Sequence, residues 1–78
     1  MLVEVSNSNF CKNIHYLRRK KRFSKKALAA KARITIDKVA QIEQEDTLLA
    51  LDYDVLLRFR MIFCCSLDIL FHSDLSEA

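Results

Sequence analysis

Glycine and proline are both absent from this chain of 78 residues. These two residues supply most tight turns, so folds built from many short strands and turns are disfavoured. The chain also lacks the glycine-rich loop that cradles phosphates in nucleotide-binding proteins. Because 51% of the residues are hydrophobic, the composition favours an all-α fold in one small, compact domain.

Long apolar segments are missing too. The longest unbroken apolar run covers residues 61–65, whereas a membrane-spanning helix needs about 20 residues. The opening MLVEVSNSN has neither the basic region nor the apolar core of a secretory signal. The three cysteines include an adjacent pair, which is not a disulfide framework. These features predict a reducing, cytoplasmic setting and no membrane association.

Acidic residues are scarce in the first half of the chain. Residues 1–40 hold eleven Lys and Arg against Glu4 and Asp37, a balance of +9. Residues 41–78 hold two Arg against eight acids, a balance of −6. A basic pole of this kind favours a polyanionic partner. The alternative is a solvated basic face without a partner.

The spacing of apolar residues predicts five helices. The first starts after Ser8 or Asn9 and ends in the cationic run 18–22, which suits the helix dipole. The second covers Lys25–Ala32 after the N-cap Ser24, and the third covers Ile36–Gln44 after the N-cap Thr35. The fourth starts at Asp52 or Asp54, and the fifth opens at Ser66 or Leu67.

The whole chain, residues 1–78, is predicted to be one domain with its core in residues 10–71. Residues 1–9 form either a short strand or a loose arm, because Leu2 to Val5 alternate in polarity. Residues 44–51 are expected to connect the third and fourth helices, and residues 72–78 to form a frayed tail.

The segment NIHYLRRKKRFSKKALAAKARITIDKVAQIE, followed by LLRFRMIFCCSLDILF, resembles the helix-turn-helix family of phage repressors (lambda repressor, Cro and XRE-type regulators). The resemblance covers roughly residues 10–71. It implies a five-helix domain that binds operator DNA as a dimer, with the second helix across the DNA backbone and the third in the major groove.

Four positions depart from this family, which often has glycine between or after its helices. They hold Arg22, Arg33, Glu45 and Cys64. Where such a position requires a positive φ, a non-glycine residue costs about 1–2 kcal/mol. We expect the helix-turn-helix to form nevertheless, with Arg33 in its turn at some strain.

The third helix has one apolar side and one outward side. Val39 and Ile42 face the core. The candidates for base contact on the outward side are Ile36, Asp37 and Gln41. Gln41 can pair with adenine, Ile36 can contact a thymine methyl group, and Asp37 can accept from cytosine. Alternatively, Asp37 only stabilises the helix dipole, and Gln41 is a solvated polar residue.

Contacts with DNA phosphates set affinity rather than sequence preference. The candidates are Lys25, Lys26, Arg33, Thr35, Lys38 and Gln44. Lys25 and Lys26 lie beside the free N–H groups that open the second helix. The alternative role of Thr35 is a plain N-cap.

The apolar stretch in residues 48–51 is either a core plug or a dimer patch. We expect Leu48, Leu49 and Leu51 to form a patch between the two copies of a homodimer. The sequence thus predicts a transcriptional regulator, a repressor, that binds double-stranded DNA. The alternative is a protein-interaction module on the same scaffold with a protein partner, either antitoxin-like or a domain whose DNA-binding surface has decayed.

Enzyme activity is not expected, because no nucleophile, base and orienting group occur together. His15 and His72 lie far apart, with no cysteine at metal-ligand spacing, so no metal and no cofactor are expected. Cys11 and Cys65 are predicted to be small buried hydrophobic residues.

Overall fold

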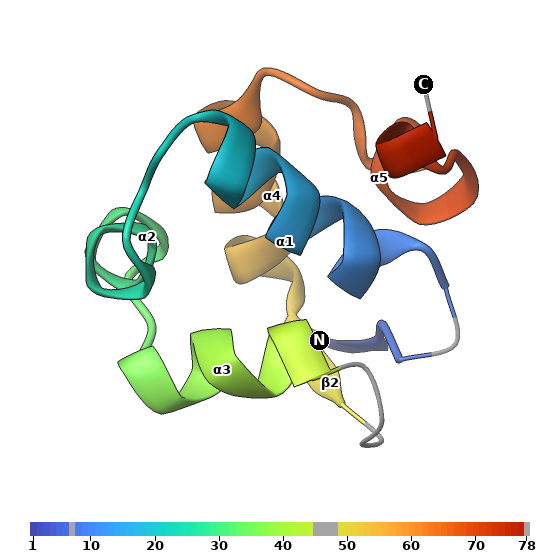
Figure 1. The fold of residues 1–78 in the computed structure, drawn as a ribbon. Coiled ribbons are helices and arrows are strands. Elements are labelled where there is room, and N and C mark those ends of the chain that lie inside the picture. The colour runs from blue at the N-terminus through green and yellow to red at the C-terminus, as the bar shows by residue number, and fades with distance from the viewer. Residues whose placement is uncertain (7, 45–48, 78) are drawn as a thin grey trace.

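A computed structural model describes residues 1–6, 8–44 and 49–77. Five helices lie where the sequence predicts them: α1 (Phe10–Lys20), α2 (Lys25–Ala32), α3 (Ile36–Gln44), α4 (Tyr53–Phe63) and α5 (Leu67–His72). The strands β1 (Leu2–Glu4) and β2 (Ala50–Asp52) and the short 3-10 helix η1 (Leu75–Glu77) complete the described part of the chain. Figure 1 shows α1 in the middle of the assembly, with α2 and α5 on opposite sides.

Polar side chains cap the N-termini of several of these helices, as the sequence predicts. The Oγ of Ser24 accepts a hydrogen bond from the backbone N–H of Ala27 at 3.0 Å. The Oγ of Ser66 accepts from Ile69 at 3.3 Å, and Asp52 accepts from Asp54 at 3.3 Å. Each cap satisfies a backbone donor that the helix itself leaves free. At α1, Ser8 accepts from Phe10 at 3.2 Å, whereas the side chain of Asn9 makes no capping bond.

The fold is not purely helical, which corrects the all-α prediction. β1 pairs with β2 in antiparallel register, with Leu2 opposite Asp52 and Glu4 opposite Ala50. The backbone N–H of Val5 continues the ladder by donating to Leu49 O at 2.9 Å. The alternation that allowed a strand at residues 2–5 therefore produces one, because its inward side chains have a core to cover.

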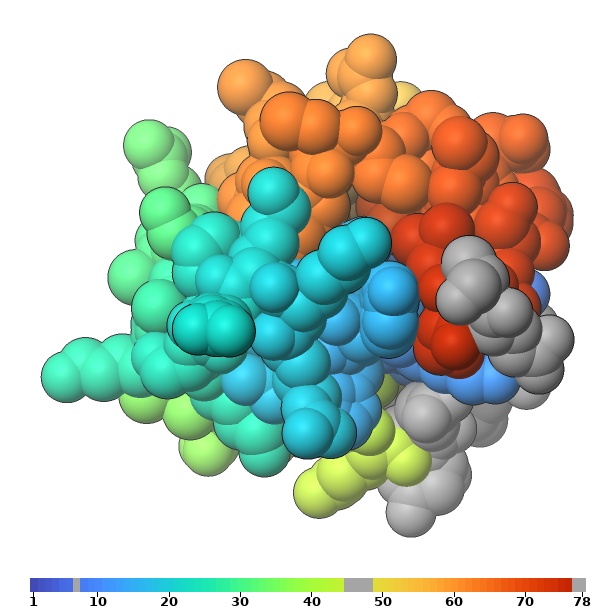
Figure 2. All heavy atoms as spheres, turned by 45° about the horizontal axis from the view of Figure 1, so that its top comes forward, coloured from blue at the N-terminus to red at the C-terminus, as the bar shows by residue number. Residues whose placement is uncertain are grey.

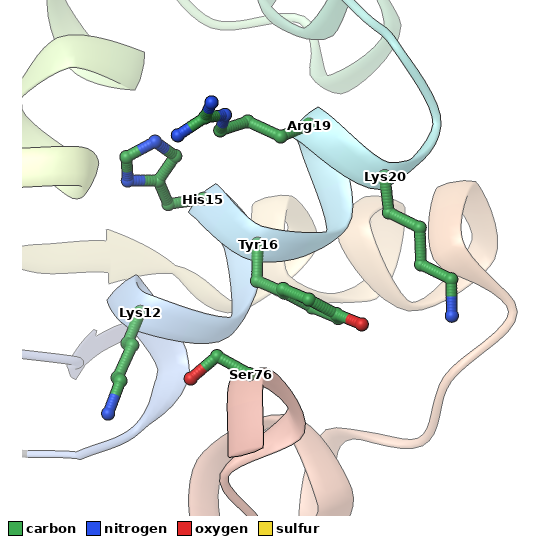
Figure 3. A pocket seen from close by; sticks show the side chains of 6 residues that line it. All are labelled: Lys12, His15, Tyr16, Arg19, Lys20 and Ser76. Carbon is green, nitrogen blue, oxygen red and sulfur yellow. The ribbon is translucent and has the colours of Figure 1, made fainter. Parts of the chain in front are cut away.

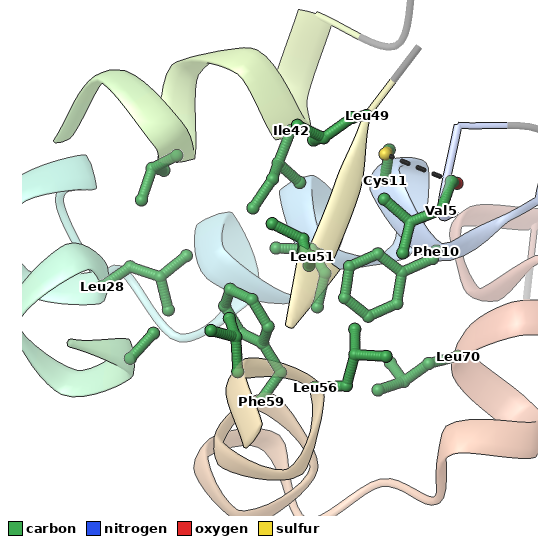
Figure 4. Packing of buried hydrophobic residues seen from close by; sticks show 14 of the residues in the cluster. Val5, Phe10, Cys11, Leu28, Ile42, Leu49, Leu51, Leu56, Phe59 and Leu70 are labelled. Atoms are coloured by element: carbon green, nitrogen blue, oxygen red, sulfur yellow. Dashed lines mark hydrogen bonds between the residues drawn. The ribbon is translucent and has the colours of Figure 1, made fainter. Parts of the chain in front are cut away.

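The inward side chains of the helices and of β2 meet in one core. Figure 4 shows Leu28, Ile42, Leu51 and Phe59 pointing from α2, α3, β2 and α4 into the same space. The ring of Phe10 packs edge-on against Phe59, with ring centroids 5.7 Å apart. The fully buried residues include Phe10, Ile14, Leu28, Val39, Ile42, Phe59 and Leu70.

Residues 72–77 are anchored rather than frayed, which corrects the prediction for this part of the tail. Asn13 on α1 is fully buried, and its Nδ2 donates to Leu70 O and Ser73 O, both at 2.7 Å. Its Oδ1 accepts from the backbone N–H of Leu75 at 3.0 Å. A single amide side chain thereby holds α5 and η1 against α1. The sequence does not indicate this role, because Asn13 lies among the apolar residues of α1.

Three of the four positions that lack the family's glycine have a positive φ. Arg22 has φ 59°, Arg33 has φ 58° and Cys64 has φ 50°. Glu45 lies outside the described residues. Each of the three side chains is exposed, so the chain adopts left-handed corners without glycine at a local cost of about 1–2 kcal/mol each.

Replacing Cys64 with glycine is expected to stabilise the protein by about 1 kcal/mol. The substitution removes the Cβ that opposes a positive φ, and the greater flexibility of glycine in the unfolded chain offsets part of the gain. In a domain of this size, that gain raises the Tm by about 4–8 °C.

Cys64→Ala is the matched control, because alanine also lacks the thiol but keeps the Cβ. Thermal unfolding should give a higher Tm for the glycine variant than for the alanine variant. Equal melting temperatures would mean that the corner carries no strain.

Candidate nucleic-acid interface

The turn between α2 and α3 is built from Arg33, Ile34 and Thr35. Arg33 caps α2 in the left-handed conformation, with its N–H directed at Ala30 O. The Oγ1 of Thr35 accepts a hydrogen bond from the N–H of Lys38 at 3.1 Å, so it caps α3. From α4, Arg58 Nη1 donates to Ala32 O at 3.2 Å. In Figure 1, α2 is seen almost along its axis while α3 lies across the view, so the two helices cross steeply.

The two sides of α3 differ as the sequence predicts. Val39 and Ile42 are fully buried. Gln41 and Asp37 are exposed, and Ile36 keeps 47% of its surface exposed. Because the core fixes one side of α3, the other side is held in a defined orientation toward solvent.

An ion pair that the sequence reading missed fastens α3 to α1. Arg18 donates from Nε to Glu43 Oε2 at 2.5 Å and from Nη2 to Glu43 Oε1 at 3.0 Å. The side chains of Arg18 and Glu43 are only 14% and 6% exposed. Arg18 also donates from Nη1 to Phe23 O at 2.8 Å. Such a two-bond pair fixes geometry better than a single contact does.

The signal for this pair was present in the sequence, because Glu43 directly follows a core residue of α3. The cationic run 18–22 was instead predicted to close α1 and to suit its helix dipole. Arg18 is the exception within it, since its side chain turns inward. His15 Nε2 also lies 3.6 Å from Glu43 Oε1.

A hollow of about 320 Å³ lies where α1, the start of α2 and α3 meet. Its lining brings together Lys25 and Gln44, two of the predicted phosphate-contacting residues. Lys26, Arg33, Thr35 and Lys38 do not line it. The full lining is His15, Arg18, Arg19, Lys25, Ala40, Glu43 and Gln44.

Unlike Arg18, the cations of α2, of the turn after it and of α3 lack acidic partners within the described residues. Lys25, Lys26 and Arg33 are exposed, Lys38 is half-buried, and none forms an ion pair within the described residues. Arg19, Lys20, Lys21, Arg22 and Lys31 are likewise exposed and unpaired there. Figure 2 shows the segment from the end of α1 through α2 (cyan to teal) as a broad face beside α4.

The predicted dimer patch is wrong for two of its three leucines. Leu49 and Leu51 are only 7% and 3% exposed and belong to the core. They are buried because pairing with β1 turns this side of β2 inward. Leu48 lies outside the described residues. The core plug, which was the alternative, is the role of Leu49 and Leu51.

The cysteines are free thiols. Cys11 is buried, as predicted, whereas Cys65 is half-buried and packs against the core. Within the described ranges, no cluster of three or more His, Cys, Asp or Glu residues is arranged to hold a metal ion. None of the helices in the described ranges has the length and apolarity needed to cross a membrane.

Comparison with protein-family models, with curated proteins and with solved structures finds no match to this chain. The function must therefore be inferred from the residues and geometry described above.

Proposed function

We propose that this protein binds double-stranded DNA in a sequence-specific manner and regulates transcription as a repressor. The observation that carries the proposal is the orientation of α3. Its apolar side is fully buried, and the ion pair of Glu43 with Arg18 links α3 to α1. Its polar side is exposed beside unpaired cations. An α-helix held in this way fits the major groove of B-DNA, which is about 12 Å wide.

The base-contacting residues in this proposal are Ile36, Asp37 and Gln41. The Gln41 amide can donate to and accept from the N7 and N6 edge of adenine. Ile36, at 47% exposure, offers an apolar surface to a thymine methyl group. Asp37, in the first turn of α3, can accept from cytosine N4 and also favours the helix start.

The phosphate-contacting residues surround α3. Lys25 and Gln44 line one hollow, while Lys26 stands beside Lys25 at the start of α2. Arg33 and Thr35 lie in the turn, and Lys38 lies in the first turn of α3. Backbone N–H groups at the start of α2 and α3 add to these contacts, because a helix N-terminus attracts phosphate.

One copy of so small a domain covers only one half-site, so the proposal includes a homodimer. Two copies related by a two-fold axis read half-sites about 34 Å apart. The burial of Leu49 and Leu51 means that this dimer must use surfaces other than the predicted leucine patch.

A protein-interaction module is the second candidate function. The half-exposed Ile36 favours it, since an apolar side chain at the start of an exposed helix face can also bury itself in a protein partner. The negative charge of Asp37 weakens phosphate binding nearby and favours this candidate as well.

Replacing Lys25 with alanine tests the DNA proposal. The variant should bind all duplex sequences more weakly, and the slope of log K against log salt should become shallower by about one unit, because one phosphate contact is lost. Fluorescence anisotropy with one random-sequence duplex at several salt concentrations measures both effects.

Lys31→Ala is the matched control. Lys31 is exposed on the same helix, but six residues further along it is rotated by about 120° around the helix axis and lies outside the hollow's lining. The proposal predicts an unchanged salt slope for this variant. Equal losses in both variants would point to a diffuse charge effect, and no loss together with a co-purifying protein would favour the interaction module.

A further inference from the structure

A second hollow, of about 530 Å³, lies between α1 and η1. Figure 3 shows its lining: five side chains of α1 and Ser76 of η1. The five α1 residues are Lys12, His15, Tyr16, Arg19 and Lys20, a spacing that places them on one side of the helix. The volume lies in the range typical of small-molecule sites, about 300–1,000 Å³.

The η1 wall of this hollow is fixed in place. Asn13 fixes the segment before and inside η1 through hydrogen bonds with Leu70 O, Ser73 O and the N–H of Leu75. Lys12 Nζ adds an ion pair with Asp74 Oδ2 at 2.7 Å. A wall that is already ordered costs a ligand little conformational entropy.

The two ends of the hollow carry different charges. At one end the carboxylate of Asp74 neutralises Lys12. The hydrogen bonds from Lys12 and then from Ser76 hold the pKa of Asp74 below its usual value, so the carboxylate is charged at neutral pH. At the other end Lys20 is exposed and has no acidic partner within the described residues, whereas Arg19 points away from it, toward His15 (Figure 3). The ammonium group of Lys20 can pair with a phosphate monoester, which carries about −1.5 to −2.

Between these ends lie an aromatic ring and a hydroxyl group. The ring of Tyr16 is half-buried, with Lys20 Nζ 5.8 Å from its centroid. Ser76 Oγ donates its proton to Asp74 Oδ1 at 2.6 Å, so its lone pairs are left to accept from an N–H or O–H group. In Figure 3, Tyr16 and Ser76 lie between α1 and η1, with Lys12 to one side and Lys20 to the other.

We propose that this hollow binds a nucleoside monophosphate unit, either free or at the unpaired end of a strand. Its ring stacks on Tyr16, its phosphate pairs with Lys20, and Ser76 accepts from a sugar hydroxyl or a base amino group. Stacking on an aromatic residue suits any base, so the site selects for a ring joined to a phosphate rather than for one base.

The site is separate from the proposed duplex surface but adjoins it. His15 and Arg19 line both hollows, whereas Tyr16, Lys20 and Ser76 line only this one. Variants of Tyr16 and Lys20 therefore test the inference without altering the hollow beside α3.

The test is a titration of the full chain, followed by NMR of backbone amides and by calorimetry, with adenosine monophosphate, adenosine and inorganic phosphate. We expect saturable binding of the monophosphate with a Kd below about 1 mM, with shifts concentrated at Tyr16 and Ser76. Adenosine and inorganic phosphate should each bind at least about tenfold more weakly, since each supplies half of the contacts. A titration with a single-stranded tetranucleotide distinguishes the two sources. If the tetranucleotide binds and the free monophosphate does not, the site takes the end of a strand.

Tyr16→Ala should weaken binding by about tenfold, and Lys20→Gln should weaken it for the monophosphate but not for adenosine. Tyr16→Phe should bind as the native protein does, and Lys31→Gln, an exposed cation outside the lining, should leave affinity unchanged. Equal affinity for phosphate and for the monophosphate would overturn the inference, as would a Tyr16→Ala variant that is folded and binds normally. Duplex binding of Tyr16→Ala, measured in parallel, should stay unchanged, so failure here is distinguishable from failure of the DNA proposal.

Discussion

Replacing Glu43 with alanine is expected to destabilise the fold by about 3–5 kcal/mol, because it leaves the guanidinium of Arg18 largely buried without its partner. Arg18 is 14% exposed in its side chain, and two of its hydrogen bonds end on Glu43. A domain of this length has a total stability of about 4–12 kcal/mol. The loss would therefore remove a large share of that stability, and urea unfolding would measure it.

The double variant Arg18→Met with Glu43→Met is the informative control. Removing both charges and keeping similar volume should cost less than Glu43→Ala alone, since no charge is left buried. A solvent-exposed pair would behave differently, with each single change costing about 1 kcal/mol or less. Single changes that small would contradict the role of this pair in fastening α3.

Replacing Asn13 with alanine is expected to cost about 3 kcal/mol. The variant strips hydrogen-bond partners from the carbonyls of Leu70 and Ser73 and from the N–H of Leu75, and it leaves a small cavity beside α5. The greatest effect should be local. Hydrogen exchange at the Leu75 amide should accelerate more than exchange in α3, because η1 loses its attachment first.

Asn13→Asp separates the hydrogen-bond geometry from side-chain size. A carboxylate at this position can still accept from Leu75, but it faces the two carbonyl oxygens without a donor. We expect it to be at least as destabilising as alanine near neutral pH, and less so in acid, where a protonated carboxyl regains one donor. Unchanged exchange at Leu75 in both variants would rule out the anchoring role of Asn13.

The sequence predicts the helices well because local signals for them agree. The apolar spacing in α1 to α5, the N-caps Ser24, Thr35 and Ser66, and the cations that end α1 all point to the same boundaries. The apolar spacing and the caps each act over a few residues, so they can be read without knowledge of the fold. Arg22, Arg33 and Cys64, which have a positive φ, were singled out only by the resemblance and not by a local signal.

Features that depend on contacts between distant residues were missed or misread. Leu49 and Leu51 looked like an exposed patch because their burial depends on pairing with a strand more than 40 residues earlier. The tail looked frayed because its anchor, Asn13, lies 57 residues before Leu70. The ion pair of Glu43 was not predicted because its partner lies on another helix, 25 residues away.

The candidate site also combines features that follow from local sequence with features that depend on contacts between distant residues. The exposure of Ile36, Asp37 and Gln41 follows from the helical period of α3 alone, and the structure places all three outward. The hollow that joins Lys25 to Gln44, and the one that joins Tyr16 to Ser76, depend on how helices pack. No local pattern in the sequence indicates either of them.

Selection of binding sites from random duplexes at physiological salt, with the native protein and with Gln41→Ala in parallel, tests the central claim most directly. The native protein should enrich an inverted repeat whose half-sites lie about 34 Å apart. The Gln41→Ala variant should keep that spacing but lose discrimination at one base pair of each half-site, at about 1–3 kcal/mol. If the native protein enriches no sequence, or if both proteins enrich the same one with equal strength, α3 does not read DNA through this face.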